Sequence, residues 1–70
     1  MAVDVQALRK RIDQAEMNQE TVANEIGMNR SSFYRKMRNR GVGFRIDEVQ
    51  KMSVVLNLTP DEVRDIFFGK

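Results

Sequence analysis

The chain has 70 residues, no cysteine, no histidine and a formal net charge of +2. This length predicts one small domain over residues 1–70, and the missing residue types exclude a disulfide framework and remove the commonest general base and metal ligand. We therefore expect no enzyme, no metal and no cofactor, and, because no apolar run approaches the roughly 20 residues of a membrane span, a location in the cytoplasm.

Five helices are predicted from a repeated start signal. In this signal a hydrophobic residue precedes the N-cap and packs on the residue five positions later, an arrangement called the hydrophobic staple. The predicted caps, in chain order, are Asp4, Asn18, Asn29, Arg45 and Thr59. Arg45 is the one cap of an unfavoured type. Pro60 and Glu62 follow Thr59 as first helical residue and capping-box acid, so the last start is the clearest.

Each predicted helix also carries apolar residues at helical spacing, which we assign to a common core. These residues are Val5, Leu8 and Ile12, then Val22, Ala23 and Ile26, then Phe33 and Met37, then Ile46, Val49, Met52 and Leu56, and finally Val63, Ile66 and Phe67. The predicted caps and the apolar residues at helical spacing together predict an all-α, compact fold with five helices.

A sharp corner is predicted between the helices expected to begin after Asn18 and after Asn29. Gly27 ends the first of them, because glycine adopts the left-handed conformation most easily, and only Met28 and Asn29 separate it from the second. Ala23, four residues before Gly27, has a side chain small enough for the crossing helices to approach closely. The pattern is that of a helix-turn-helix.

The charge is unevenly distributed along the chain. Six basic residues and no acid lie between Asn29 and Arg45, whereas the remaining residues comprise six basic and ten acidic ones. The short stretch therefore carries a charge of +6 and the remainder −4. Such segregation indicates a polyanionic partner, and we expect nucleic acid.

The sequence resembles the Cro and phage-repressor (lambda repressor-like) type of helix-turn-helix domain from about Leu8 to Phe67. The matching residues are Asn18, Gln19, Glu20, Val22, Ala23, Ile26, Gly27, Ser32 and Phe33, with the stretch 56–59. The resemblance implies a five-helix fold with the helix-turn-helix at its second and third helices. It also implies a DNA-binding transcription regulator, such as a small phage or prophage repressor or Cro-like protein, in the cytoplasm of a bacterial host cell.

The sequence departs from this family at three positions. Many members bury an Arg–Glu pair between the first and third helices, and the aligned positions here are Ile12 and Met37. Apolar residues of similar volume commonly replace a buried ion pair without loss of stability, so we expect the helix contact to persist. The third departure is Lys36, where the family usually has an apolar residue.

The face of segment 30–38 opposite Phe33 and Met37 is predicted to read the bases of double-stranded DNA. Its residues are Asn29, Arg30, Ser31, Tyr34, Arg35 and Arg38. An arginine can donate two hydrogen bonds to guanine O6 and N7, which makes Arg30 and Arg35 the leading candidates for base readout.

Phosphate contacts are predicted on both sides of this face. By resemblance, Gln19 reaches one phosphate, and the loop with Arg40 and Arg45, backed by the start of the next helix, binds another. Lys36 is a further candidate for a phosphate contact, although for Lys36 and Arg38 a solvated surface charge is an equal alternative.

Two neighbouring segments complete the predicted surface. Gly41 and Gly43 are expected to let the amides of their loop approach a phosphate closely. The basic run at residues 9–11 lies near Asp13 and Glu16, and we expect these charges to be solvated.

A partner surface is predicted near the end of the chain. Phe67 and Phe68 cannot both face the core of one helix, so one of them is available to a partner unless Phe68 folds back over the hydrophobic edge. With Leu58, the spare ring would form the interface of a homodimer on DNA. The same surface supports a competing function, that of an antirepressor or modulator that binds another phage regulator.

Overall fold

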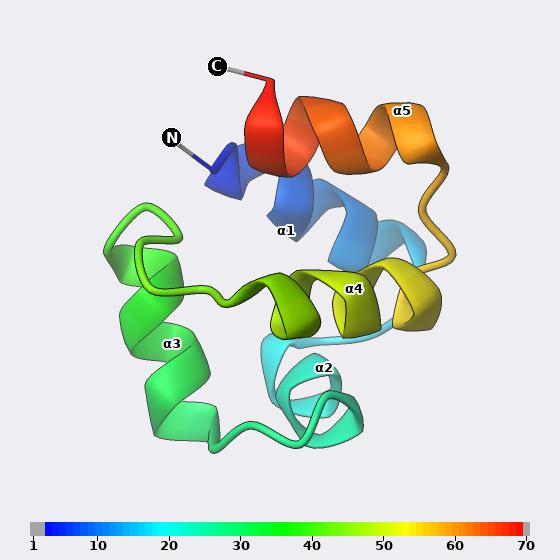
Figure 1. The fold of residues 1–70 in the computed structure, drawn as a ribbon. Helices are drawn as coiled ribbons and strands as arrows, with labels where there is room; N and C mark the ends of the chain where they lie inside the picture. The colour runs from blue at the N-terminus through cyan, green and yellow to red at the C-terminus, as the bar shows by residue number, and fades with distance from the viewer. Residues whose placement is uncertain (1–2, 70) are drawn as a thin grey trace.

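The computed structural model describes residues 3–69, which form five helices and no strand. The helices are α1 (Val5–Gln14), α2 (Gln19–Glu25), α3 (Arg30–Arg38), α4 (Ile46–Val55) and α5 (Pro60–Val63), which continues as a π-helical turn over Arg64–Phe68. Helix α3 stands at the left in Figure 1, and α5, α1, α4 and α2 follow one another from top to bottom beside it. The predicted all-α class is confirmed, and none of these helices is long and apolar enough to cross a membrane.

All five predicted helix starts are confirmed. At four of them the cap side chain accepts a hydrogen bond from a backbone N–H of the first turn, namely at Asp4, Asn18, Asn29 and Thr59. Arg45 has no such acceptor, and its own backbone N–H donates to the Glu48 carboxylate at 2.9 Å. The fourth start is therefore stabilised by an acid three residues into the helix.

Four of the five helices end in left-handed residues. Gly27 has φ +74°, and Met28 N–H donates to the Ala23 carbonyl at 2.8 Å, as expected for the predicted corner. Three other helices end in the same way at Glu16, Arg40 and Asn57, with φ between +53° and +61°. None of these three ends was predicted, because none is a glycine.

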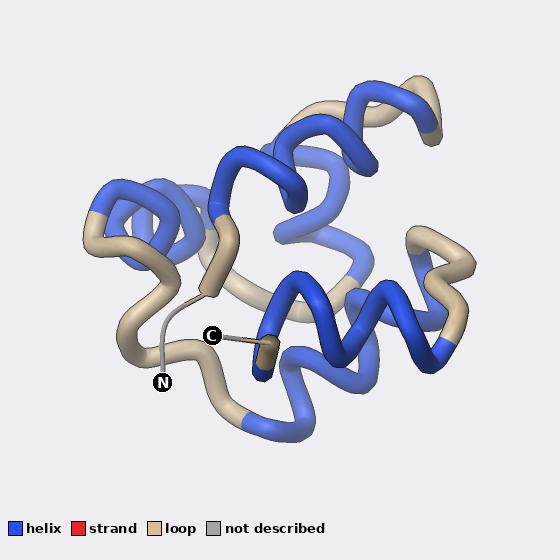
Figure 2. Tube along the Cα trace, turned by 90° about the horizontal axis from the view of Figure 1, so that it is seen from above, coloured by secondary structure: helices blue, strands red, loops and turns tan. Residues whose placement is uncertain are grey.

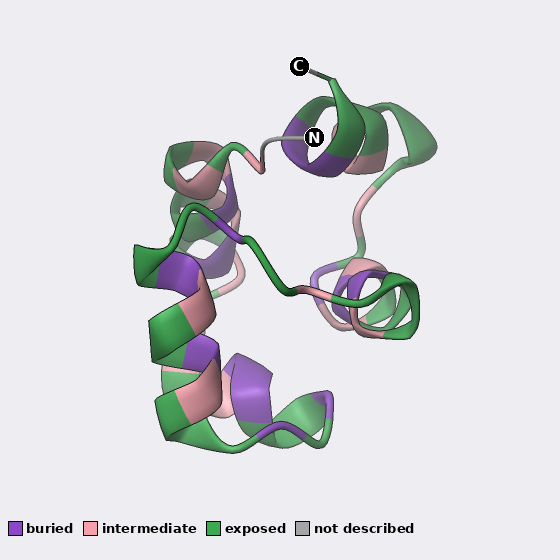
Figure 3. Cartoon of the chain, turned by 60° about the vertical axis from the view of Figure 1, so that its left-hand side comes forward, coloured by how far each residue is buried: buried purple, intermediate pink, exposed green. Residues whose placement is uncertain are grey.

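One hydrophobic core joins the helices. Its buried residues are Leu8, Ile12, Val22, Ala23, Ile26, Met28, Phe33, Met37, Val49, Met52, Leu56, Ile66 and Phe67. Figure 3 shows the buried side of α3 turned toward the other helices and its exposed side turned outward. Ile12 and Met37 are both 2% exposed, so the two apolar residues that replace the ion pair are buried in the core. The assignment of Ile46 to the core was wrong, since this first residue of α4 is 68% exposed.

The two ends of the described chain lie side by side (Figure 2), and Asp4 N–H donates to the Ile66 carbonyl at 2.7 Å. Arg11 connects α1 to the same region, with Nε 2.9 Å from the Glu62 carboxylate and Nη2 donating to the Leu56 carbonyl. The hydrogen bond from the Thr59 backbone, followed by the charge of Arg11, lowers the pKa of Glu62. The expectation that Arg11 is a solvated charge was therefore wrong.

Candidate nucleic-acid interface

The corner between α2 and α3 places α3 at the edge of the molecule. Val22, Ile26, Met28 and Phe33 are buried in the angle between the two helices. With one side of α3 held by this packing, its other side is free of neighbouring elements in Figure 1. The arrangement is the helix-turn-helix geometry that the short Gly27 connection predicted.

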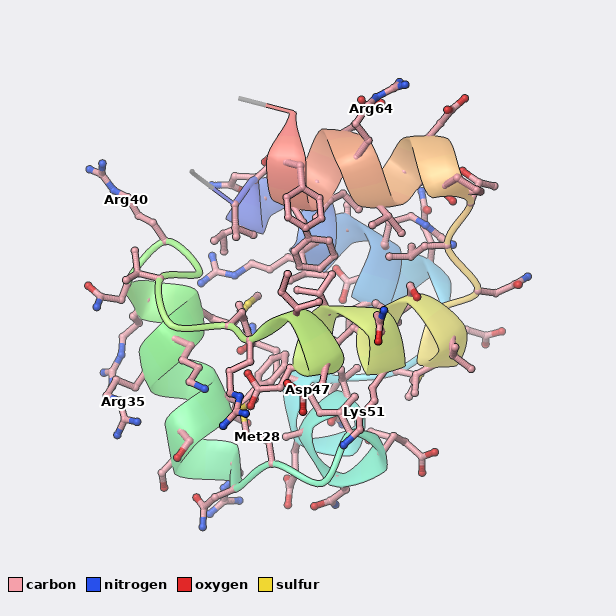
Figure 4. All side chains as sticks on the ribbon, in the orientation of Figure 1. Met28, Arg35, Arg40, Asp47, Lys51 and Arg64 are labelled. Carbon is pink, nitrogen blue, oxygen red and sulfur yellow. The ribbon has the colours of Figure 1, made fainter. Side chains whose placement is uncertain are left out.

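The outer side of α3 is strongly basic. Its exposed residues are Asn29, Arg30, Ser31, Tyr34, Arg35 and Arg38, the same set that the sequence placed there. Arg35 projects away from the body of the molecule in Figure 4. Within residues 3–69 neither Arg35 nor Arg38 forms an ion pair, so both guanidinium groups are available to an external acceptor.

Arg30 is held at the start of α2. Its Nη1 lies 3.4 Å from the Glu20 carboxylate, and both side chains are more than half exposed. An exposed pair of this kind contributes at most about 1 kcal/mol, so Arg30 can exchange Glu20 for another acceptor at little cost.

An open groove runs between α1, the start of α2 and the outer side of α3. It is lined by Arg9, Asn18, Gln19, Tyr34, Met37 and Arg38. Gln19 therefore lines the same groove as two arginines from other helices. The sequence predicted a solvated Arg9 because acids follow it. No local pattern distinguishes Arg9 from Lys10, and only the arrangement of α1 relative to α3 brings Arg9 to this groove.

The loop after α3 adds charge on the other flank. Arg40 is exposed and points outward on the same side of the molecule as Arg35 (Figure 4). Arg45 is exposed as well, with Nε 3.3 Å from the Asp47 carboxylate. Asp47 and Glu48 occupy the first turn of α4 and offset the positive end of its dipole. The structure therefore does not support the expectation that the start of α4 itself binds a phosphate.

Comparison with protein families decides the class of this surface. The model of the Cro/C1-type HTH DNA-binding domain matches residues 7–67. The chain belongs to this family. No curated protein and no solved structure shows a significant match. Membership supports a DNA-binding regulator, and it places the whole basic surface within the matched region.

Lys36 has a different environment from the other cations on α3 of this Cro/C1-type domain. Its Nζ lies 3.2 Å from the Glu48 carboxylate, and the two side chains are 17% and 16% exposed. Lys36 thus faces α4 rather than the outer side of α3. This position explains how a lysine replaces the usual apolar residue, and it removes Lys36 from the predicted phosphate contacts.

Gly41 also has a packing role in this Cro/C1-type domain. Its N–H donates to the Lys36 carbonyl at 2.7 Å, and the Val3 side chain lies against its α-carbon. Because the amide of Gly41 is already used, the expectation that it approaches a phosphate was wrong. Gly43 is exposed, and its φ of +98° allows the sharp turn of the loop.

The aromatic pair at the end of the chain is divided between core and surface. Phe67 is 1% exposed and belongs to the core, whereas Phe68 is 44% exposed. Leu58 is half-buried and packs against the core. Phe68 is therefore the ring available to a partner, and Phe67 is excluded from the predicted interface.

Proposed function

We propose that the protein is a transcription regulator that reads a specific double-stranded DNA site with the outer side of α3. The observation that supports this most directly is the row of exposed arginines on α3, of which Arg35 and Arg38 have no acid partner among residues 3–69. An arginine fork without an internal partner can donate two hydrogen bonds to a guanine in the major groove. Asn29, Ser31 and Tyr34 complete the proposed base-reading face.

Phosphate contacts would flank this face on both sides. On one side we assign them to Arg40 and Arg45 in the loop after α3. On the other side we assign them to Gln19, at the start of α2, and to Arg9, which lines the same groove. Contacts of this kind fix the register of a protein on the duplex without reading sequence.

The working form on DNA would be a two-fold dimer. Successive half-sites on one side of the duplex lie about 34 Å apart. The longest extent of this chain is 26 Å, so one copy reads one half-site only. Phe68 supplies an exposed ring at the end of the last helix, which lies away from the outer side of α3 in Figure 1. Leu58, which packs against the core, lies just before the start of the same helix.

The more specific assignment is a phage or prophage repressor or Cro-like protein, which its small size and family favour. The exposed ring of Phe68 also supports the competing function of an antirepressor that binds another regulator. We infer no catalytic role for either function, because the family binds DNA and the basic stretch contains no acid that could act as a catalytic group.

A binding titration at several salt concentrations tests the proposal. We expect one site enriched from a random pool to be bound at least 10³-fold more tightly than random duplex at physiological salt. Weak binding that falls steeply with salt and shows no preferred site would instead select the protein-interaction function.

Replacing Phe68 by alanine tests the dimer. We expect Phe68→Ala to reduce cooperative occupancy of a full site while half-site affinity stays unchanged, because Phe68 lies away from the base-reading face. Val54→Ala is the control, since Val54 is an exposed apolar residue on α4, 79% exposed. One-to-one stoichiometry on a full site, with no loss for Phe68→Ala, would exclude this dimer. Stoichiometry and cooperativity are read from the same titration by gel shift.

A further inference from the structure

Lys36 joins α3 to the start of α4 through one acid. Its Nζ lies 3.2 Å from one carboxylate oxygen of Glu48 and 3.4 Å from the other. The first of these oxygens also accepts the backbone N–H of Arg45 at 2.9 Å. A single carboxylate therefore connects the base-reading helix, the last residue of the loop and the first turn of α4.

The same lysine covers the end of the loop. Its Nζ lies 5.9 Å from the centre of the Phe44 ring, and its methylene chain lies against Gly43. The buried ring of Phe33 also meets Phe44 edge to face, with centroids 5.6 Å apart. Phe44 thus contacts both the buried ring of Phe33 and Lys36, which links the end of the loop to α3.

We propose that Lys36 and Glu48 are positioning residues for DNA binding. They hold the loop that carries Arg40 and Arg45 at a set distance from the reading side of α3, and Lys36 does not itself contact DNA. The inference rests on the proposed function, because it concerns the spacing between the base contacts and one row of phosphate contacts. A shift of this loop would prevent both sets of contacts from forming at once.

Electrostatics separates this role from a direct phosphate contact. If Lys36 bound a phosphate, its loss would release one counterion fewer and reduce the salt slope of binding by about 0.9. Glu48 would then act only as a negative charge near DNA, and its neutralisation would tighten binding. The positioning role requires the opposite result for Glu48, because the neutral side chain no longer holds the ammonium group.

The test measures affinity for the enriched site with Lys36→Met, Glu48→Gln and the double variant. Glu48→Gln keeps an acceptor for the Arg45 amide, and Lys36→Met keeps most of the chain over Phe44. We expect each single variant to bind on the order of fivefold more weakly with an unchanged salt slope, and the double variant to bind no more weakly than either. Circular dichroism at the assay temperature gives the folded fraction by which each affinity is corrected.

Asp47→Asn is the matched control. It removes the same charge from the same turn, but among residues 3–69 Asp47 pairs only with the exposed side chain of Arg45. We expect this variant to bind as tightly as the parent protein or more tightly. Tighter or unchanged binding by Glu48→Gln, or a salt slope reduced by about 0.9 in Lys36→Met, would overturn the positioning role.

Hydrogen exchange in the free protein tests the proposal without DNA. The amides of Val42 and Phe44 donate within the loop, to Asn39 and Gly41. In Lys36→Met we expect these two amides to exchange faster while the amides of α1 stay unchanged, and unchanged loop exchange would refute the restraint. A parent protein that prefers no DNA site would refute the proposed function instead, so the two failures are distinguishable.

Discussion

Replacing Gly41 by alanine is expected to destabilise the protein more than any other glycine-to-alanine change. Gly41 has φ +75°, where a residue with a Cβ atom costs about 1–2 kcal/mol. A Cβ atom here would also overlap Val3, with its two methyl carbons at 2.6 and 2.9 Å. Overpacking of this kind costs about 1–3 kcal/mol more. The sum approaches the roughly 5 kcal/mol of total stability at the low end for small proteins.

Gly27→Ala is the matched control for this prediction. Gly27 has nearly the same backbone conformation, at φ +74°, but no atom lies within 4 Å of the position that its Cβ would occupy. We expect Gly27→Ala to lose only the conformational part, about 1–2 kcal/mol. Urea denaturation measures the free energy of unfolding of both variants. Equal losses would show that Val3 moves aside at no cost and that the N-terminal segment is not anchored on the loop.

The helix starts were predictable because their signals are local. A cap side chain such as Asn18 bonds an N–H three residues away, and the sequence shows both partners. The ends at Glu16, Arg40 and Asn57 were not predictable in this way. Positive φ is uncommon for residues other than glycine, and a glutamate or an arginine in the sequence does not indicate that conformation.

The residues of the candidate site were likewise predictable where their signals are local and unpredictable where they depend on packing. The exposed side of α3 followed from the inward positions of Phe33 and Met37, which the helical period determines. The position of Arg9 beside α3 and the contact of Lys36 with Glu48 depend on how separate helices pack. The sequence alone does not show whether a basic side chain faces solvent, an acid or DNA. Only the fold therefore distinguishes the environment of Lys36 from that of Arg35.

Base readout by Arg35 carries the largest expected effect on specificity. Arg35→Ala should weaken binding to the preferred site by about 1–3 kcal/mol, roughly 5- to 150-fold, and relax the preference at one base pair. Arg35→Lys should relax the same base pair while keeping the salt slope, because lysine retains the charge but cannot form the two-pronged contact with guanine. Competition titrations against all single-base variants of the site measure both changes.

Arg40 and Arg64 provide the comparison that makes the Arg35 result interpretable. Arg40→Ala should weaken all duplexes alike and reduce the salt slope by about one, as expected for loss of a phosphate contact. Arg64 is exposed but paired with Asp61 and Asp65, and Figure 4 places it at the top of the molecule, away from Arg35. Arg64→Ala should leave binding unchanged. If Arg35→Ala and Arg40→Ala instead cause equal losses on every duplex, α3 binds only the DNA backbone, because an arginine that reads a base must discriminate between sequences.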